Sequence, residues 1–504
     1  MDRRRTAPSL LAALSGALYA IALPPLGVDA LGWVAFAPLF VAVAAVRPGR
    51  AFGLGMLWFL VGSFGFASAM PHLISTYFDV PWAVGAAAFL GLTIAFGPLY
   101  GCYAAWISWL AGRGAANPLL AAAGLGTVEW ARTSAGSIFG WALAAHTQTP
   151  GSVVLQSADI GGAYLPGMVL TASAFAIASW FSPSLLPHRR GAWNVGIGLT
   201  VIAALAYGGV VRPAEPVSED GLRVAIVQGG IPHEARWQPE GAGEDLDHYL
   251  DLTEETELFE PDLVVWPEYA IAFNLRPRSE ERARLFDVTA NGGPDLLFGA
   301  PYHRGLSPLI LQNSAFLLHD GKLAGRYDKN ELLPFAERSP LPAWVTSDRT
   351  QFTPGRKASP IATSDIPVGI FLCSEGLRPG MARRVTANGA TVLANLSNDS
   401  WLGTRAAARM QLRSTALRAI ENRRYLLRAT GSGKSALIGP DGRVLVSSEY
   451  GAQDTLFGVV EARTGRTFYN QHGDVLAVLA LVLAGLGSLR AIRRGPATSA
   501  AVRR

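Results

Sequence analysis

The sequence predicts a chain with two structural parts, a multi-span α-helical membrane domain and an α/β domain that faces water. Three observations predict this division. Half of the 504 residues are hydrophobic and only 16% are charged, which is unlike a single soluble globular protein. Asp79 is the only Asp, Glu, Lys or Arg between Ala51 and Leu110, whereas residues 222–466 have an ordinary soluble composition. Within that second region short apolar runs alternate with helical stretches, which is the pattern of an α/β domain.

Eight apolar segments are long enough to be transmembrane helices, which need roughly 17 to 25 mostly apolar residues. The fifth is interrupted by Glu129 and Arg132. The eighth is short, so the long side chain of Arg490 must extend to the membrane interface. The predicted spans are residues 8–24, 30–46, 51–70, 83–111, 117–133, 159–182, 192–211 and 474–492.

The basic residues between the spans predict the orientation of the chain. The runs "DRRR", "RPGR", "PHRRG" and "RAIRR", together with Arg113, all fall on one side of the membrane. Because cytoplasmic loops are enriched in Lys and Arg, this side is the cytoplasm. We therefore expect both termini in the cytoplasm and the α/β domain in the periplasm of a bacterial-type inner membrane. The many later spans favour retention of the first as an anchor over its removal as a signal peptide.

Four regions follow from these spans. We predict a membrane domain of about seven helices at 1–212, a water-facing α/β domain at 220–466, a C-terminal transmembrane helix at 474–492 and a basic cytoplasmic tail at 493–504. Much of the net charge of +5 lies in short runs beside apolar stretches, which is typical of membrane loops and argues against a nucleic-acid partner. The two cysteines, one in each part, cannot form a disulfide framework.

The α/β domain begins with a short apolar run that ends in glycines, "LRVAIVQGG", and four later segments repeat this pattern. Each is a run of apolar residues that stops at Gly, Pro, Asn or Asp, so each is a predicted buried strand. These segments are "PDLVVWPEYA", "PDLLFGAPY", "IPVGIFLCSEG" and "ATVLANLSND". Helices are predicted near residues 244–259, 279–291 and 404–422, and Asp-Gly turns predict hairpins in "LLHDGKLAG" and "LIGPDGRVLV".

Three titratable residues lie at the ends of predicted strands or near a hairpin: Glu268, Lys329 and Cys373. Reactive groups in α/β sheets gather at the carboxyl ends of strands. A thiol nucleophile needs a base to take its proton, and the oxyanion formed on attack needs a positive or N–H partner. A glutamate, a lysine and a cysteine meet these needs. Taken singly, each has a plainer interpretation, as a loop acid, a surface lysine and a packed cysteine.

This Glu-Lys-Cys order resembles the nitrilase, or carbon-nitrogen hydrolase, superfamily, which has an α-β-β-α sandwich fold. With seven predicted spans before such a domain and one after it, the full chain resembles the apolipoprotein N-acyltransferase family. The motifs that carry the resemblance are "WPE" with Glu268, "K" followed by "LLPFAE" with Lys329 and Glu337, "CSE" with Cys373 and Glu375, "VQGGIPHEARW" ending at Trp237, "NLSNDSWLG", and "EW" with Arg132 before "GWALAAHTQTP".

The resemblance implies a role for each of these residues. Glu268 would be the general base, Lys329 the oxyanion stabiliser and Cys373 the nucleophile. No metal, nucleotide or redox cofactor would be needed. The further residues that the resemblance implies are Glu337, Glu375 and Ser374 in support of the triad and Trp237 as a substrate-binding residue at the lipid-facing entrance.

The implied reaction takes a fatty acyl chain from a phospholipid as a thioester on Cys373. The chain would then pass to the α-amino group of an S-diacylglyceryl-cysteine at the N-terminus of an apolipoprotein, the last step of lipoprotein maturation. Such a two-step transfer predicts ping-pong kinetics. Two alternatives stay open: a membrane-anchored amidohydrolase that uses the same triad with water as acceptor, and a catalytically idle paralogue that binds lipoproteins.

Four sites depart from the family pattern. Ser374 stands where a tyrosine usually follows the nucleophile, and Ala336 stands where a glycine precedes the supporting glutamate. The segment "RAAARMQLR" replaces a Gln-His after "NDSW", and an Asn-Asn-Gly appears here as Gly431, Ser432 and Gly433. These differences leave the triad intact and bear on substrate choice and rate.

Two basic segments have competing interpretations. The segment "GSGKS", Gly431 to Ser435, resembles a phosphate-binding loop, but Arg428 occupies the place of the first glycine and no helix pattern follows. We therefore predict a hairpin turn. The arginines within 405–424 are predicted to form the solvated face of a helix, with a patch for phospholipid headgroups as the alternative.

Three residues of the predicted membrane domain are also notable: Glu129, Arg132 and Cys102. Glu129 and Arg132 are three residues apart near the end of a span, so they form either a structural ion pair or a functional site, because charges inside a membrane are costly. Cys102 lies within the fourth span and is predicted to be packed there.

Overall fold

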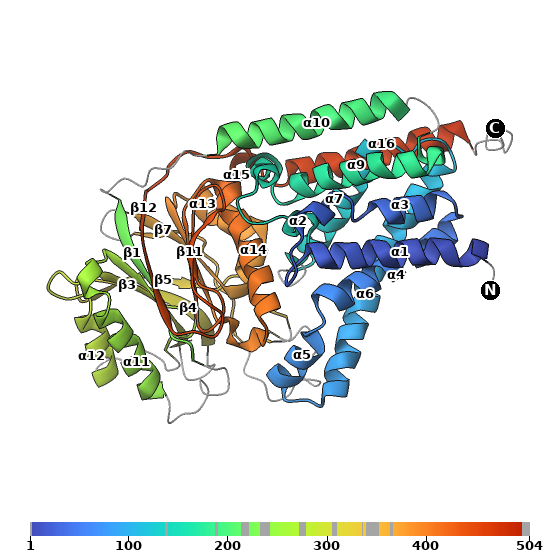
Figure 1. The fold of residues 1–504 in the computed structure, drawn as a ribbon. Helices are drawn as coiled ribbons and strands as arrows, with labels where there is room; N and C mark the ends of the chain where they lie inside the picture. Colours follow the sequence, from blue (N-terminus) through green and yellow to red (C-terminus); the bar gives the residue numbers. More distant parts are fainter. Residues whose placement is uncertain are drawn as a thin grey trace. The chain divides into compact units, whose positions relative to one another are not determined.

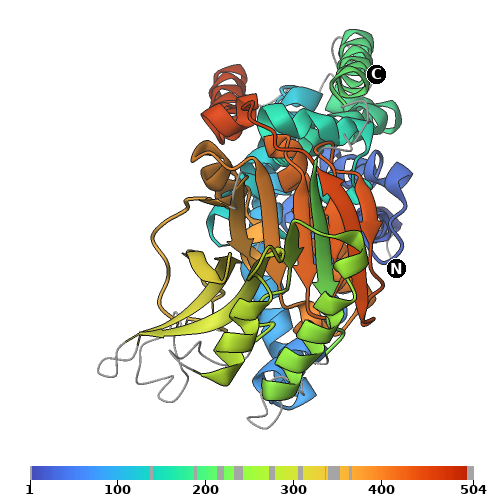
Figure 2. The same cartoon turned by 90° about the vertical axis from the view of Figure 1, so that its left-hand side faces the viewer.

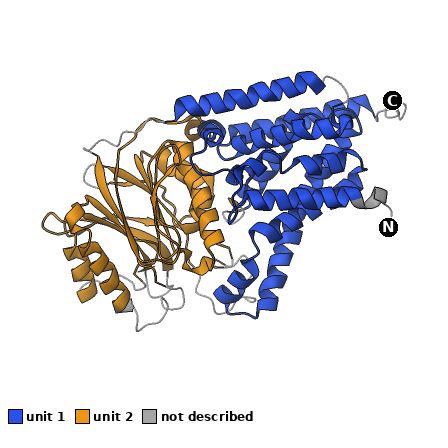
Figure 3. Ribbon diagram, viewed as in Figure 1, with its two compact units in different colours: residues 1–135, 141–212, 472–504 blue, residues 136–140, 213–471 orange. Residues whose placement is uncertain are grey.

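Figure 1 shows the computed structural model of the chain, which divides into two compact units (Figure 3). The helical unit comprises residues 1–135, 141–212 and 472–504, and the mixed α/β unit comprises residues 136–140 and 213–471. The residues that the structure describes are 3–136, 140–186, 190–212, 221–231, 242–271, 279–304, 310–334, 336–338, 352–362 and 366–495.

The helical unit consists of helices made largely of apolar residues, separated by non-helical breaks. Among the described residues, five helices are long and apolar enough to cross a membrane: α4, α6, α9, α10 and α16. The α-helices of this unit are α1 (Arg3–Ala22), α2 (Asp29–Gly32), α3 (Ala37–Ala44), α4 (Pro48–Phe66), α5 (Met70–Phe78), α6 (Trp82–Ala111), α7 (Pro118–Ser134), α8 (Ala158–Gly161), α9 (Tyr164–Phe181), α10 (Arg190–Val211) and α16 (Val475–Arg494).

The predicted spans coincide with helices, with three breaks. The span predicted at 30–46 is divided into α2 and α3, with Pro38 in the first turn of α3. The span at 159–182 is divided into α8 and α9 at Gly162, whose φ of 63° is incompatible with a continuing helix. The span at 51–70 ends at Phe66, before α5 begins. Single-sequence hydropathy cannot detect such breaks, because the residues within them are as apolar as the helices.

Close contacts between small residues hold the helical unit together. A Cβ atom at Gly55 of α4 would lie 2.3 Å from the carbonyl oxygen of Tyr100 in α6, so the two backbones are in direct contact. Membrane helices pack in this way because lipid provides no hydrophobic force between them. The Trp58 ring next to this contact packs on Tyr19, Phe36 and Tyr100, with centroids 4.9–5.1 Å apart.

The α/β unit contains two six-stranded sheets (Figure 2). The first has the order β12-β1-β2-β3-β4-β5 and the second has the order β11-β10-β9-β8-β7-β6. Each has a parallel centre, β1-β2-β3 and β7-β8-β9, flanked by antiparallel strands. The strands are β1 (Leu222–Gln228), β2 (Leu263–Val265), β3 (Asp295–Arg304), β4 (Ile310–His319), β5 (Lys322–Asp328), β6 (Ile361–Ala362), β7 (Pro367–Leu372), β8 (Val392–Ser397), β9 (Leu426–Thr430), β10 (Ala436–Ile438), β11 (Val444–Ser447) and β12 (Asp454–Val460).

Helices cover the outer face of each sheet (Figure 1). The first sheet packs against α11 (Ala242–Glu254) and α12 (Glu280–Asp287), and the second packs against α13 (Pro379–Ala387) and α14 (Arg405–Asn422). The short helix α15 (Phe468–His472) follows β12 along the chain. The layers therefore form the α-β-β-α sandwich that the resemblance implied.

The continuous apolar runs in the sequence arise because both faces of the central strands are buried. In β1, Val224 and Ile226 point into the core between the two sheets, whereas Ala225 and Val227 point toward α11 and α12. The five predicted strands are present, and both Asp-Gly segments form the antiparallel hairpins β4-β5 and β10-β11. The helix predicted at 244–259 is interrupted after α11 and resumes as a 3-10 turn at Glu257–Phe259.

Candidate active site

Glu268, Lys329 and Cys373 come together at one edge of the two sheets. Each follows the carboxyl end of a strand: Glu268 follows β2, Lys329 follows β5 and Cys373 follows β7. All three are buried, with 2%, 1% and 4% of their surface exposed. The plainer interpretations of a solvated loop acid and a surface lysine are therefore wrong, because burial of a charge requires specific partners.

The Lys329 ammonium lies between two carboxylates. Its Nζ donates to Glu337 Oε1 at 2.9 Å and to Glu268 Oε1 at 3.3 Å. Burial alone would lower the pKa of this amine, but the two carboxylates raise its pKa well above the ordinary value. Lys329 is therefore a fixed cation, which is suited to stabilising a developing oxyanion and not to accepting a proton.

One backbone N–H and one side-chain amide also donate hydrogen bonds to Glu268. Asn398 N–H donates to Glu268 Oε2 at 2.8 Å, and the side chain of Asn313 donates to Glu268 Oε1 at 2.7 Å. The same Asn313 Nδ2 donates to Glu337 Oε1 at 2.8 Å, so it joins the two carboxylates. Sequence reasoning missed Asn313, although a fully buried asparagine inside the apolar strand β4 is a recognisable signal.

The backbone at Cys373 is in the left-handed region. Its φ is 45°, which is uncommon for a residue other than glycine and places the thiol at the sharp junction between β7 and a 3-10 turn, Cys373–Leu377. Burial raises the pKa of the Cys373 thiol, the charge of Glu268 raises it further, and the charge of Lys329 lowers it. The resting sulfur is therefore a neutral thiol, so its proton must leave during attack.

Glu375 joins the backbone segments that carry the lysine and the cysteine. Its carboxylate accepts N–H bonds from Asn330 and Glu331, which follow Lys329, and from Leu372, which precedes Cys373, at 2.7–3.0 Å. The Tyr327 hydroxyl donates to the same carboxylate. Burial raises the pKa of Glu375 to about 7, against the lowering effect of these backbone donors. Glu375 is thus a scaffold for the site.

Of the remaining predicted site residues, Ser374 and Glu337 lie near the triad, whereas Trp237 is not among the described residues. Ser374 is buried beside the nucleophile, and its Oγ has no hydrogen-bond partner among the described residues. The Glu337 side chain, besides its contact with Lys329, accepts the Leu333 N–H at 2.8 Å, which fixes the loop that carries it. Trp237 lies outside the residues that the structure describes. Where side chains are described, no cluster of three or more His, Cys, Asp or Glu is arranged to hold a metal ion.

The segment "GSGKS" is the turn between the antiparallel strands β9 and β10, as predicted, and a strand follows it instead of the helix that a phosphate loop requires. The Ser435 hydroxyl donates to Gln228 at 2.7 Å, so this turn is fixed to β1. Gly433 is confined by packing, since a Cβ there would lie 2.3 Å from the Cβ of Asp399.

The prediction of a solvated arginine face is only partly correct. Arg405 and Arg409 of α14 are exposed, but Arg418 is buried and pairs with Glu421 at 2.8 Å. Arg424, just past the helix, is also buried and donates to backbone carbonyl oxygens. The periodicity of one helix does not reveal what packs against its polar side, which is why the prediction failed.

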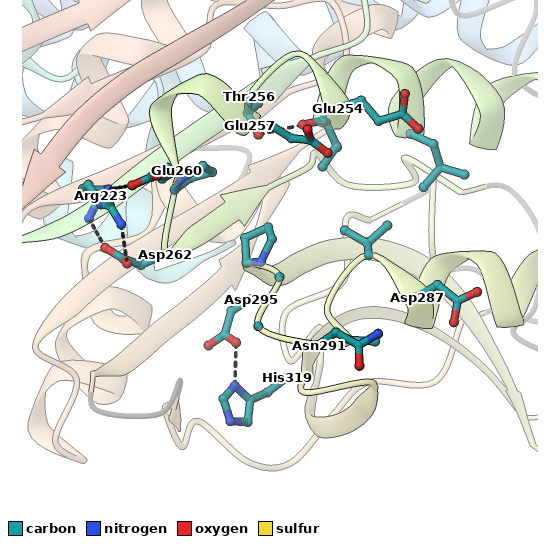
Figure 4. Close-up of a pocket in the computed structure, with 18 of the residues that line it drawn as sticks. Arg223, Glu254, Thr256, Glu257, Glu260, Asp262, Asp287, Asn291, Asp295 and His319 are labelled. Atoms are coloured by element: carbon teal, nitrogen blue, oxygen red, sulfur yellow. Dashed lines mark hydrogen bonds and ion pairs between the residues drawn. The ribbon is translucent and has the colours of Figure 1, made fainter.

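A separate cavity of about 1010 Å³ lies at the opposite edge of the first sheet, beside the amino-terminal ends of β1, β2 and β3 (Figure 4). Some of its charged groups pair with one another: Arg223 with Glu260 and Asp262, and His319 with Asp295. None of the predicted site residues lines it. The large cavity is thus distinct from the Glu268-Lys329-Cys373 cluster.

Comparisons with known proteins show which families the sequence matches. Residues 223–468 match the family model for carbon-nitrogen hydrolases, and residues 15–176 match the apolipoprotein N-acyltransferase N-terminal domain. An apolipoprotein N-acyltransferase of Geobacter metallireducens is 30% identical, with 96% of this chain and 95% of that protein covered. One of Caulobacter vibrioides is 30% identical, with coverage of 97% and 95%.

Among solved structures, an amidase of the nitrilase superfamily from Nesterenkonia AN1 is 18% identical, with 53% of this chain and all of that chain covered, at a TM-score of 0.41. A carbon-nitrogen hydrolase from Helicobacter pylori is 20% identical, with coverage of 47% and 87%, at a TM-score of 0.38. The full-length relatives and the two matched domains establish the family: the chain belongs to the apolipoprotein N-acyltransferases, membrane-bound enzymes that acylate lipoproteins.

Proposed function

We propose that the protein transfers a fatty acyl chain from a phospholipid, through a thioester on Cys373, to the α-amino group of an N-terminal S-diacylglyceryl-cysteine of an apolipoprotein. The observation that carries this proposal is the buried cluster in which Lys329 lies between Glu268 and Glu337 beside the Cys373 thiol. Base, cation and nucleophile are the three groups that acyl transfer through a thioester requires.

In the first step the Glu268 carboxylate takes the proton of the Cys373 thiol as the sulfur attacks the ester carbonyl carbon. The oxyanion that forms is stabilised by the Lys329 ammonium, whose raised pKa keeps it charged. Collapse of the tetrahedral intermediate breaks the ester C–O bond. The leaving alkoxide of the lysophospholipid takes the proton back from Glu268, and Cys373 is left as a thioester.

In the second step the lipoprotein α-amine attacks the thioester carbonyl carbon. Glu268 takes a proton from the attacking nitrogen and returns it to the departing Cys373 sulfur, so the enzyme regains its starting state. The reaction of a neutral amine with a thioester requires only one base, to take the amine proton, and one cation, to stabilise the oxyanion. The same residues therefore serve both half-reactions, and ping-pong kinetics follow because the lysophospholipid leaves before the amine reacts.

The proposal includes the topology that the basic runs predict. The α/β unit would lie in the periplasm and both termini in the cytoplasm of the inner membrane, where phospholipids and diacylated lipoproteins are both present. The five apolar helices that are long enough to span a bilayer support a multi-pass protein.

Intact mass spectrometry of the detergent-purified protein after incubation with phospholipid tests the first step. We expect a mass gain of one acyl group that hydroxylamine removes, that Cys373→Ala abolishes and that Cys102→Ala retains. Without an adduct on the folded protein, release of ammonia from small amides would favour the amidohydrolase, and neither reaction would favour the idle paralogue.

A further inference from the structure

Arg428 is a fully buried cation at the level of the candidate active site. It lies in β9, and in the register of the second sheet it neighbours Asn395 of β8, which in turn neighbours Phe371 of β7. The strand residues on both sides of Arg428, Leu427 and Ala429, point into the core between the sheets, so the guanidinium lies on the outer, α14-covered face. Burial of such a cation is costly unless its partners are fixed.

The guanidinium group binds the side chains of Asn395 and Asp399, and it makes a longer contact with Thr415 Oγ1 of α14 at 3.4 Å. One terminal nitrogen, Nη1, donates to Asn395 Oδ1, and the other, Nη2, donates to a carboxylate oxygen of the buried Asp399. The planar fork of arginine can hold two acceptors in a fixed relative orientation, which the single ammonium of lysine cannot do. Arg428 therefore links the end of β8 to the loop that follows it.

The first branch leads to the nucleophile. With its oxygen engaged by Arg428, the Asn395 amide donates from Nδ2 to the carbonyl oxygens of Phe371 at 3.1 Å and Cys373 at 3.5 Å. These contacts lie on either side of the junction where Cys373 adopts its φ of 45°. Residues in this backbone region persist only where the surrounding structure holds them.

The second branch leads to the base. Asp399 accepts a hydrogen bond from Ser397 at 2.6 Å, so the Arg428-Asp399 pair constrains the residues on both sides of Asn398. The backbone N–H of Asn398 is the group that donates to Glu268 Oε2 at 2.8 Å. The close packing of Gly433 against Asp399 restricts this loop further.

We propose that Arg428 is a positioning residue that fixes the general base Glu268 and the nucleophile Cys373 relative to each other. It acts on Glu268 through Asp399 and Asn398, and on Cys373 through Asn395. This inference rests on the proposed roles of Glu268 and Cys373. It assigns a function to a residue that touches neither substrate nor reacting atom.

The test compares Arg428→Lys with Arg424→Lys in a Cys102→Ala background of the full-length, detergent-purified protein. Arg424 is the matched control, because it is also a buried arginine near the start of β9, and its acceptors among the described residues are backbone carbonyl oxygens, such as that of Ala390. The readouts are the rate of alkylation of Cys373 by iodoacetamide as a function of pH, the rate of acyl-adduct formation, and thermal unfolding.

We expect Arg428→Lys to slow alkylation and adduct formation by about 10- to 100-fold, since small misplacements of reacting groups have effects of this size. Loss of the Asn398 N–H bond removes a donor to the Glu268 carboxylate, so protonation of the base occurs at higher pH. The decrease in the alkylation rate at acidic pH, which we call the acidic limb of the pH profile, should therefore occur at higher pH in Arg428→Lys. It should stay at the same pH in Arg424→Lys.

Two further variants separate the branches. Asp399→Asn weakens the branch to the base and should also shift the acidic limb. Asn395→Asp keeps an acceptor for Arg428 but cannot donate to the Cys373 carbonyl oxygen, so it should slow alkylation without that shift.

Equal pH profiles for Arg428→Lys and Arg424→Lys would overturn the positioning role. Absence of an acyl adduct in the Cys102→Ala parent would instead refute the proposed function, so the two failures are distinguishable.

Discussion

Buried charged side chains occur in both units of the chain, and they have different kinds of hydrogen-bond partner. In the α/β unit, the Lys329 ammonium meets the carboxylates of Glu268 and Glu337 directly. In the helical unit, the buried charges of α7 bind backbone groups of the segment that follows the helix. Glu129 accepts the Ala144 N–H at 2.6 Å, and Arg132 donates to the carbonyl oxygens of Trp141 and Ala142 at 2.9 and 3.1 Å.

These different partners allow the two clusters to do different things. Carboxylates that face an ammonium and a thiol can exchange a proton and be neutralised again, so the Lys329 cluster can support a reaction. Side chains that hold backbone N–H and C=O groups stabilise one conformation of a loop. The arrangement around Glu129 and Arg132 therefore favours the structural alternative over the functional one, although their contacts are with backbone instead of with each other.

The largest effect is expected from Lys329→Met, because it leaves two buried carboxylates without their cation. Removing one partner of a buried ion pair destabilises a protein by roughly 3–5 kcal/mol, and acyl-adduct formation should disappear as well. Thermal unfolding and mass spectrometry measure both effects. Lys322→Met is the matched control, since Lys322 forms an exposed ion pair with Asp320 at 3.4 Å and its loss should cost less than about 1 kcal/mol. Comparable losses in the two variants would contradict a special role for the Lys329 cluster.

Glu268→Gln should remove the base while keeping the shape of the site. The amide oxygen can still accept hydrogen bonds, and Glu337 still neutralises Lys329, so the unfolding temperature should change little. Acyl-adduct formation should fall by roughly 100- to 10,000-fold, the usual contribution of general base catalysis. Glu260→Gln, in the exposed pair with Arg223, is the control. Near-normal adduct formation in Glu268→Gln would show that another group takes the thiol proton.

Glu375 should make stability depend on pH. Its pKa is about 7 in the folded chain and 4.5 as the ordinary value, so the folded state binds more protons between these limits. The contribution of Glu375 to the free energy of unfolding is fully present below pH 4.5 and is lost as pH rises through about 7. The change is about 3 kcal/mol, because each pKa unit corresponds to about 1.36 kcal/mol. The free energy of unfolding of Glu375→Gln, measured with denaturant, should not show this decrease over the same pH range. The same pH dependence in the variant and the parent would assign it to other groups.

The smallest effect is expected from Glu129→Gln. The amide oxygen can still accept the Ala144 N–H, so replacing a charged acceptor by a neutral one should cost about 1 kcal/mol. Adduct formation on Cys373 should be unchanged if Glu129 only holds a loop. A loss of adduct without a loss of thermal stability would return Glu129 to the functional alternative and remove the contrast between the two units.

The sequence was informative wherever a property depends on the local chain. Apolar runs with both faces buried predicted the central strands, Asp-Gly pairs predicted the hairpins, and strand-end positions located Glu268, Lys329 and Cys373. The resemblance added Glu337 and Glu375, but the structural role of Glu375 could not be predicted, because its N–H partners come from two segments, Asn330–Glu331 and Leu372, that are far apart in the chain. Backbone donors leave no trace in a sequence pattern.

Other features could not be predicted from the sequence, because they depend on tertiary contacts. Arg428 entered the sequence analysis only as a residue that breaks a motif, and nothing local shows that it bridges Asn395 and Asp399. Cys102, predicted to be packed inside its span, is exposed on α6. A hydropathy pattern shows that a helix is apolar, but it does not show which face contacts its neighbours and which would contact lipid.

The most direct test of the central claim is a chase of the isolated acyl-enzyme. The protein is loaded with a phospholipid that carries an isotopically labelled acyl chain, freed of donor, and mixed with a synthetic diacylated lipopeptide. We predict that the label leaves Cys373 and appears in an amide on the lipopeptide α-amine, with one equivalent transferred per thioester. Label that appears only as free fatty acid, with the lipopeptide unchanged, would contradict the proposed transfer and identify water as the acceptor.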